Sequence, residues 1–398
     1  MTDSDSGIRG TARLTRSSIL VFAAVCGFTV ASTYYFQPLF PAVGSDLHQS
    51  AATVSWVSTV LQVGYSVGLF LIVPLGDYFD RRRLVPALMA ASVIGLIGIT
   101  TATSLTAVLV WSALVGLSSV VAQVVVGLVA TIANPEQRGK AIGNVMTGLL
   151  LGILLARTVS GFVAQYLSWR YMFGAAAVAV GVLAVFATRR IPFVERSYEG
   201  SYLALLRSLG ETFATEATVR RAALTGALNF ACFSIFWNTS SLHLSAPPFR
   251  FGSAVIGLFG LIGVAGALAA RLAGRMADSG RQWLTSAVMN ALILVAFVLL
   301  EIEGFNLIGV IMAVVVLDFG VQGSHISNQS MIYGIRADAR SRITSIYMTS
   351  YFVGGALGSF YSTLAFRSGG YQLVALGGVL AAGASMALRL FSPRTQDR

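Results

Sequence analysis

The chain has 398 residues, of which 56% are hydrophobic and only 11% are charged. A soluble domain carries about 25% charged residues, so this composition, with a mean hydropathy of +0.76, excludes an ordinary soluble protein and indicates an integral membrane protein. The formal net charge is +11, but the basic residues are scattered among short loops. That distribution argues against a nucleic-acid partner and favours contact with anionic lipid headgroups. Cys26 and Cys232 lie in apolar stretches and imply no disulfide framework.

Apolar segments long enough to span a bilayer follow one another along the chain. After a polar tail over 1–17, the first apolar run covers 18–43. It is longer than a signal-peptide core of about 7–15 residues, so we expect an uncleaved membrane helix. Twelve membrane-spanning helices are predicted in all. They lie at 18–43, 53–75, 84–103, 106–133, 141–166, 171–188, 222–245, 253–273, 283–300, 305–334, 343–366 and 371–390.

The positions of the basic residues test this number of spans. With twelve spans, 23 of the 27 Lys and Arg residues fall on one face of the membrane and only Arg170, Arg250 and Arg367 fall on the other. Arg157 alone lies within a span. Because positive charge concentrates in cytoplasmic loops, this split predicts that both termini are cytoplasmic. We expect the chain to lie in the inner membrane of a bacterium.

The interval 189–221 is the only long polar stretch inside the chain. It has mixed charge, which predicts a cytoplasmic linker with a short interfacial helix around Tyr202 to Phe213. This linker divides the chain into its expected parts. The parts are a tail at 1–17, a six-helix half at 18–188, the linker at 189–221, a second six-helix half at 222–390 and a tail at 391–398.

The two halves repeat each other. RGKAIGNVMTGLLLG begins at Arg138 and RSRITSIYMTSYFVG begins at Arg340, an offset of 202. LGDYFDRRR and MADSGRQ form a second pair, in which Asp77 matches Asp278 at an offset of 201. Two matches at nearly one offset indicate duplication. Halves with six spans each have the same orientation, so we expect them to be related by an axis along the membrane normal.

These features resemble the major facilitator superfamily of secondary transporters, over about residues 15–392. The markers are the loops with an aspartate and arginines after spans two and eight, and the basic loops after spans four and ten. In span five, GNVMTGLLLGILLARTVSG resembles the antiporter motif of the drug:proton antiporter branch. Gly143, Gly152 and Gly161 keep its spacing, whereas Ala156 and Arg157 replace a Gly-Pro pair.

Other positions depart from that branch. Tyr78 stands where the family has arginine, and Ser112 in span four stands where an arginine is linked to proton coupling. The resemblance implies an all-α membrane fold of two pseudo-symmetric six-helix halves, in which spans one, four, seven and ten line a central cavity. It also implies that charged loops close the cytoplasmic side. The expected gating residues are Asp77, Asp80, Arg81, Arg82, Arg138, Asp278, Arg281, Arg340 and Arg342.

Three ionisable residues lie deep inside the expected spans. Asp318 is the only acid there, His325 the only histidine and Arg157 the only base at mid-span. Asp318 is 13 residues from the outer end of its span, or about 20 Å at 1.5 Å per residue. Because such groups are costly in a membrane, we expect them to face a cavity and assign proton coupling to Asp318, His325 and Arg157. The alternative is a buried polar network that fixes helix packing.

A polar stripe accompanies the acid. Asp318, Gln322, His325 and Gln329 are spaced i, i+4, i+7 and i+11, which places them on one helical face. Serines 324 and 327 fall on another face, where they could bond to their own helix backbone. The predicted substrate-binding residues are Gln322, Gln329, Asn328, Gln123, Tyr35, Gln37, Trp237 and Asn238.

The predicted function is proton-coupled secondary transport by alternating access, with export of small organic or amphipathic compounds. The alternatives are proton-coupled uptake of a metabolite or organic anion and, more remotely, a non-transporting sensor. No GxxxxGK[ST] loop is present, which argues against an ATP-driven pump. Asp318 and His325 are two turns apart on one helix, about 10 Å, so they predict no enzyme. We expect no cofactor, no metal and a monomer.

Overall fold

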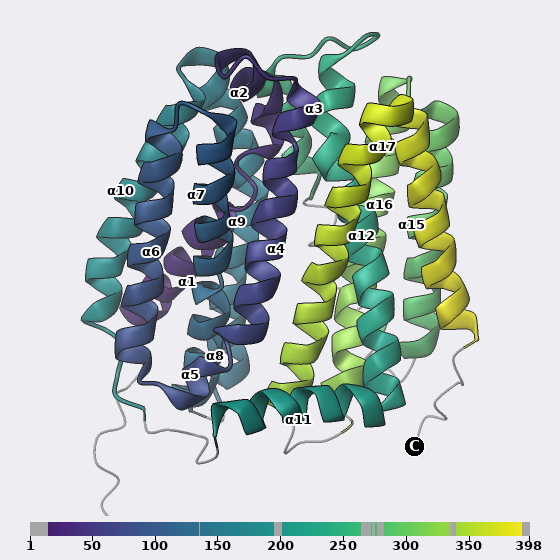
Figure 1. Ribbon diagram of the computed structural model, residues 1–398. Helices are drawn as coiled ribbons and strands as arrows, with labels where there is room; N and C mark the ends of the chain where they lie inside the picture. The colour runs from purple at the N-terminus through teal and green to yellow at the C-terminus, as the bar shows by residue number, and fades with distance from the viewer. Residues whose placement is uncertain are drawn as a thin grey trace, which may run out of the picture.

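The computed structural model describes residues 15–134, 136–194, 201–263, 272, 275–276, 282–333, 335 and 340–391, and every regular element within them is helical. Figure 1 shows two helical bundles side by side, one built from the first part of the chain, purple to teal as far as α10, and one from the second part, teal to yellow from α12 on. Helix α11 (Tyr202–Thr215) runs along one end of both bundles. We call this the α11 end, and the opposite end the far end.

The first bundle begins with a broken helix, because Pro38 and Pro41 lack the N–H that a continuous helix needs. Helix α1 ends at Ala31, and the chain resumes as a short 3-10 turn and a second helix. The elements are α1 (Arg16–Ala31), η1 (Gln37–Leu39), α2 (Phe40–Asp46), α3 (Ala51–Val54), α4 (Trp56–Leu71), α5 (Leu75–Tyr78), α6 (Arg81–Thr101), α7 (Leu105–Ser118), α8 (Val121–Ile132), α9 (Arg138–Tyr166) and α10 (Trp169–Thr188).

The second bundle follows the linker helix. A helix, α11, forms where the interfacial helix is expected, and the last two expected spans appear as one element, α17. Within α17 the chain turns back at Gly369 and Gly370, where Gly370 has a φ of +66° that glycine adopts readily. The elements are α12 (Ala217–Ser245), α13 (Ser253–Leu258), η2 (Phe259–Gly263), α15 (Gln282–Glu303), α16 (Leu307–Tyr333) and α17 (Arg340–Leu390).

Eight helical stretches among the described residues are long and apolar enough to cross a bilayer. The smaller number than the expected twelve has structural reasons. Helix α17 contains two expected spans, and α1 is shortened by its break. Helix α12 has 29 residues but is rich in Ser, Thr and Asn. The span expected at 253–273 is described only through residue 263 and at residue 272.

Two glycines of α9 permit close helix contacts. A Cβ at Gly152 would lie 2.2 Å from the carbonyl oxygen of Gly27 in α1. A Cβ at Gly161 would lie 2.3 Å from the carbonyl oxygen of Ser253, at the start of α13. Both glycines belong to the sequence that resembles the antiporter motif. The Gly152 contact packs α9 against α1 within the first bundle. The Gly161 contact packs α9 against α13 of the second bundle.

Side-chain hydrogen bonds also join the bundles. Near the far end, the hydroxyls of Ser55 and Thr363 are 2.9 Å apart. Deeper along α4, the amide of Gln62 donates to the Ser234 hydroxyl at 3.0 Å. With the Gly161 contact, these interactions hold the bundles together over the part of their interface toward the far end.

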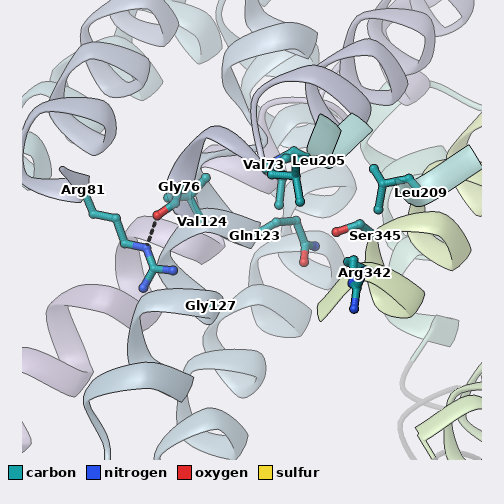
Figure 2. A pocket seen from close by; sticks show the side chains of 11 residues that line it. Val73, Gly76, Arg81, Gln123, Val124, Gly127, Leu205, Leu209, Arg342 and Ser345 are labelled. Atoms are coloured by element: carbon teal, nitrogen blue, oxygen red, sulfur yellow. Dashed lines mark hydrogen bonds between the residues drawn. The ribbon is translucent and has the colours of Figure 1, made fainter. Parts of the chain in front are cut away.

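A small cavity of about 60 Å³ lies at the α11 end, large enough for a few water molecules. Figure 2 shows Gln123 of α8 on one side of it and Arg342 and Ser345 of α17 on the other. Leu205 and Leu209 of α11 complete the lining. The two bundles are therefore in direct contact toward the far end, and a small cavity lies between them at the α11 end.

Helix α11 is fixed to both bundles. The Tyr202 hydroxyl donates to the carbonyl oxygen of Leu71, at the end of α4, at 2.5 Å. Partial burial raises the pKa of Tyr202. The buried Leu209 packs in one apolar cluster with Ile343 and Tyr347 of α17. The linker helix thus bridges the two bundles beside the cavity.

Candidate functional site between the bundles

Asp318 lies in the middle of α16 and is 4% exposed. Among residues whose side chains are described, it is the only buried Asp or Glu. Its Oδ1 accepts a hydrogen bond of 3.1 Å from the indole nitrogen of Trp237 in α12. Gly263 of η2 packs close to its other oxygen, because a Cβ there would lie 3.3 Å from Oδ2. The carboxylate is therefore held in place by two other elements of its own bundle.

Arg157 approaches the same place from the first bundle. It is 3% exposed and lies in α9. Its Nε donates to Oε1 of Gln37 in η1. The ring of Trp237 lies 4.0 Å from the guanidinium carbon, and the rings of Tyr34 and Phe233 lie at 5.0 and 5.5 Å. Aromatic faces attract a guanidinium, more strongly when the group is desolvated.

The two buried charges come from different bundles and are close enough to interact electrostatically. They share Trp237, which donates its N–H to Asp318 and turns its ring face to Arg157. Removing one member of a buried charge pair leaves the other uncompensated, which is strongly unfavourable. At this depth the two bundles thus meet at a buried carboxylate, a buried guanidinium and the tryptophan between them.

His325 lies two turns from Asp318 and has a different set of partners. Its Nδ1 is 3.0 Å from the hydroxyl of Tyr347, and its ring lies 4.6 Å from that of Tyr351. Gln329 contacts α17 as well, with its Nε2 3.8 Å from the sulfur of Met348. Gln322 is half-buried and has no hydrogen bond to another described residue. The inner part of the predicted stripe therefore faces α17.

Aromatic rings connect the Arg157 region to His325, a feature that the sequence interpretation missed. Phe230, Phe233 and Trp237 are spaced i, i+3 and i+7 on α12, so they share one face. Phe230 stacks on Phe233 at 5.4 Å and on Tyr351 of α17 at 4.2 Å. We call these rings, Phe230, Phe233, Trp237 and Tyr351, the aromatic column. The helical spacing of its three α12 members was a signal that could have revealed it.

A ring from the first bundle joins the column. Tyr65 of α4 lies 4.3 Å from Phe352 of α17, which in turn lies 4.9 Å from Phe230. The Tyr65 hydroxyl is also 3.5 Å from the side-chain nitrogen of Gln123. Aromatic rings from both bundles therefore pack together here, with charged groups at one end and an imidazole and an amide toward the other.

Three predicted substrate-binding residues lie away from this group. Tyr35 packs edge-on against Phe173 of α10, inside the first bundle, and the neighbouring Tyr34 faces Arg157 instead. Asn238 donates to Ser362 and Thr363 of α17. Asn328 is near a Ser286 hydroxyl in α15, at 3.5 Å. Of the predicted residues, Gln37 and Trp237 are those in direct contact with Arg157.

A second polar cluster lies inside the second bundle. Asn229 of α12 donates to Asn290 of α15 at 2.8 Å and to Ser324 of α16 at 2.7 Å, and accepts from Ser385 of α17 at 2.6 Å. The expectation that Ser324 bonds to its own helix backbone is therefore wrong, because buried amides on α12 and α15 offer it partners. This cluster joins four segments of one bundle.

The predicted gating residues lie at the α11 end where they are described. Arg81 is buried and donates to the carbonyl of Gly76 at 2.8 Å and to Thr131 at 3.1 Å. Asp80 caps α6 by accepting from the Arg82 N–H at 2.9 Å. Arg138 is exposed, and Arg342 lines the cavity. Asp278 and Arg281, and the side chains of Asp77 and Arg340, lie outside the described residues.

No group of three or more His, Cys, Asp or Glu side chains that could hold a metal occurs in the part of the chain that the structure describes. The chemistry available between the bundles is that of a carboxylate, a guanidinium, an imidazole and phenol groups. These groups can bind and release protons and recognise polar ligand groups.

Comparisons with known proteins agree with this architecture. Residues 19–359 match the family described as Major Facilitator Superfamily. The chain is 42% identical over 375 residues to the "Putative uncharacterized transporter YgaY" of Escherichia coli K12, covering 94% of each chain. It is 31% identical over 377 residues to the "Probable transporter SCO4007" of Streptomyces coelicolor, covering 93% of this chain and 85% of that one.

Solved structures share the fold. A bacterial homolog of the human lysosomal transporter Spinster, in an inward-facing and occupied conformation, superposes with a TM-score of 0.76 at 11% identity, over 95% of this chain and 96% of that chain. An identity this low shows the fold alone. The family match, the relatives and the fold agree that this is a multi-pass membrane protein and not an enzyme, and that it belongs to the Major Facilitator Superfamily of transporters.

Proposed function

We propose that the chain is a proton-coupled secondary transporter that works by alternating access, with Asp318 as the group that carries the proton. The observation that supports this most is the pairing of two buried charges from different bundles, Asp318 and Arg157, around the shared ring of Trp237. A carboxylate at this place exerts an attraction between the bundles when it is ionised and loses that attraction when it is protonated.

Protonation is thereby linked to movement. Ionised Asp318 favours the conformation described above, in which the bundles touch toward the far end. A proton on Asp318 weakens that contact and eases opening of the far end. We propose that the α11 end is cytoplasmic, as the distribution of arginines indicates, and that the predicted gating residues close that end in the opposite conformation. A proton moving inward releases about 2.3 kcal/mol per 100 mV of membrane potential.

Two directions of transport are compatible with this mechanism. Export of small organic or amphipathic compounds in exchange for protons is supported by the aromatic rings packed between the bundles, which include Phe230, Phe233 and Tyr65. Uptake of an organic anion together with protons is supported by Arg157, whose buried Nη2 has no hydrogen-bond partner among the described residues.

The experiment is flux in proteoliposomes with a pH dye inside, after a broad thermal-shift screen has identified a ligand. We expect the ligand to cause proton movement in the wild type and none in Asp318→Asn. Asp46→Asn is the matched control, because Asp46 lies at the far end and pairs with Arg170. Proton movement of the same size in Asp318→Asn would remove Asp318 from the proposal. The sign of the movement separates exchange from cotransport.

A further inference from the structure

We infer that Arg157 is the recognition point for the carboxylate of an aromatic substrate, and that this substrate anion and the proton on Asp318 bind cooperatively. The inference rests on the proposed function, which it deepens by naming a substrate class and the sign of the coupling. It is built from the surroundings of one guanidinium, from the rings beside it and from the charges that face Asp318.

The guanidinium is held in a fixed orientation but keeps an unused donor. Gln37 occupies Nε, and the rings of Trp237, Tyr34 and Phe233 crowd the guanidinium carbon. Nη2 is buried and has no hydrogen-bond partner in the described parts of the chain. A buried unpaired donor on a charged group costs free energy, so the site is complete only when an acceptor binds. The best acceptor for a guanidinium edge is a carboxylate.

Asp318 does not supply that acceptor in this conformation. Its Oδ1 takes the indole N–H of Trp237. No ion pair within 4.0 Å joins Asp318 to Arg157, both of which are fully described. The two charges attract at longer range, and a guanidinium donor remains for a second anion.

The rest of the ligand is indicated by the aromatic column. Phe233 lies beside both Arg157 and Trp237, and it stacks on Phe230, which stacks on Tyr351. A planar aromatic group whose carboxylate reaches Arg157 would lie along these rings. Aromatic pairs in such geometry contribute about 0.5–1.5 kcal/mol each beyond their buried area. Recognition of a flat aromatic carboxylate uses the charge and the rings at once.

The sign of the coupling follows from the charges. When Asp318 is ionised, its negative charge and the positive charge of Arg157 cancel, and Asp318 repels a substrate anion. With Asp318 protonated, the site is positive and accepts the anion more readily. The other titratable groups around the two charges are Tyr34, which faces Arg157, Tyr351 and, two turns along α16 from Asp318, His325. By reciprocity, the anion also favours protonation of Asp318. Cooperative binding of this kind moves the proton and the anion in the same direction. With a proton gradient directed inward, that direction is uptake.

The test measures binding to the purified full chain by titration calorimetry, with matched acid and alcohol pairs. The pairs are benzoate with benzyl alcohol, 2-naphthoate with 2-naphthalenemethanol, and indole-3-acetate with indole-3-ethanol. We expect at least one acid to bind about tenfold or more tightly than its alcohol, since a hydrogen bond to a charged group contributes about 1.5–3 kcal/mol. Failure of all three acids to bind, or equal binding of acid and alcohol, overturns the inference.

The dependence on pH and three variants complete the test. Acid binding should tighten between about pH 8 and pH 6, where the probes stay ionised because a carboxyl group has a pKa of about 4. Arg157→Gln should reduce acid binding to the level of the alcohol, whereas Arg157→Lys should keep part of the preference. Asp318→Asn should bind the acid without pH dependence. Arg170→Gln is the control, since Arg170 pairs with Asp46 at the far end.

Two outcomes separate this inference from the proposed function. If Asp318→Asn abolishes proton-coupled flux of a neutral compound and no acid is preferred, the proton carrier stands and the anion site fails. If the acid is preferred through Arg157 but its binding does not change with pH, the coupling between proton and anion fails. The wild-type comparison of acid with alcohol remains decisive even if a substitution of Arg157 prevents folding.

Discussion

The protein contains two buried polar clusters with different partners. Asn229, Asn290, Ser324 and Ser385 join helices of one bundle through uncharged hydrogen bonds. Asp318 and Arg157 bring charges from two bundles to the same tryptophan. A cluster inside one bundle can remain intact while the bundles move as rigid bodies. In the proposed mechanism, a cluster between bundles breaks when the far end opens, so its charges can control that opening.

The largest effect should come from forcing the bundles apart beside the charged cluster. Gly161→Leu places a side chain where even a Cβ would lie 2.3 Å from the Ser253 carbonyl oxygen. We expect substrate counterflow in proteoliposomes to be lost, because the far end can no longer close. The thermal unfolding temperature should change much less, since the amide cluster is untouched.

Gly143→Ala is the matched control for that substitution. Gly143 lies on the same helix and keeps the same motif spacing, but a Cβ there meets no atom within 4 Å. We expect normal counterflow from this variant. Normal counterflow from Gly161→Leu would mean that the far-end contact of α9 with α13 is not needed for the transport cycle.

A substitution in the amide cluster should have the opposite profile. Asn229→Ala removes hydrogen bonds to Asn290 and Ser324 and leaves buried groups unpaired, at a cost of about 1–3 kcal/mol in the free energy of unfolding. The unfolding temperature should fall, while flux per folded molecule stays near the wild-type value. Asn306→Ala is the control, since Asn306 is exposed and caps the start of α16. Loss of flux without loss of stability would assign this cluster a direct role in transport.

The smallest effect concerns a charge pair at the surface of the far end. Hydrogen bonds from Arg170 and Trp169 hold the pKa of Asp46 below its usual value. The pair therefore adds stability above the unfolded pKa of about 3.9, and this stability disappears as pH falls through the lower folded value. The side chains are 29% and 43% exposed, so Asp46→Asn should cost well under about 1 kcal/mol at neutral pH.

The measurement is the difference in unfolding temperature between wild type and Asp46→Asn at about pH 7 and about pH 3. We expect a small difference at the higher pH and a smaller one at the lower. Arg207→Gln, which breaks the exposed Arg207–Glu211 pair on α11, serves as a comparison. An equal or larger difference at low pH would show that Asp46 contributes by packing and not by charge.

The sequence predicted the membrane fold, the linker helix and the isolation of Asp318 and Arg157, because hydropathy, charge distribution and helical spacing are local properties. It selected Tyr35, although Tyr34 faces Arg157, because the break after Ala31 changes the orientation of the residues that follow. It assigned Asn238 to the substrate site, although its partners lie on α17, more than 100 residues away. Such contacts depend on tertiary packing, which periodicity within one helix does not specify.

The central claim is that Asp318 couples proton binding to transport, and its most direct test compares two modes of flux in Asp318→Asn. Counterflow requires binding and alternation but no net proton movement, whereas accumulation driven by a pH gradient requires coupling. We predict that Asp318→Asn retains counterflow of an identified substrate and loses gradient-driven accumulation to the level of empty liposomes. Gradient-driven accumulation at the wild-type level in this variant would contradict the account.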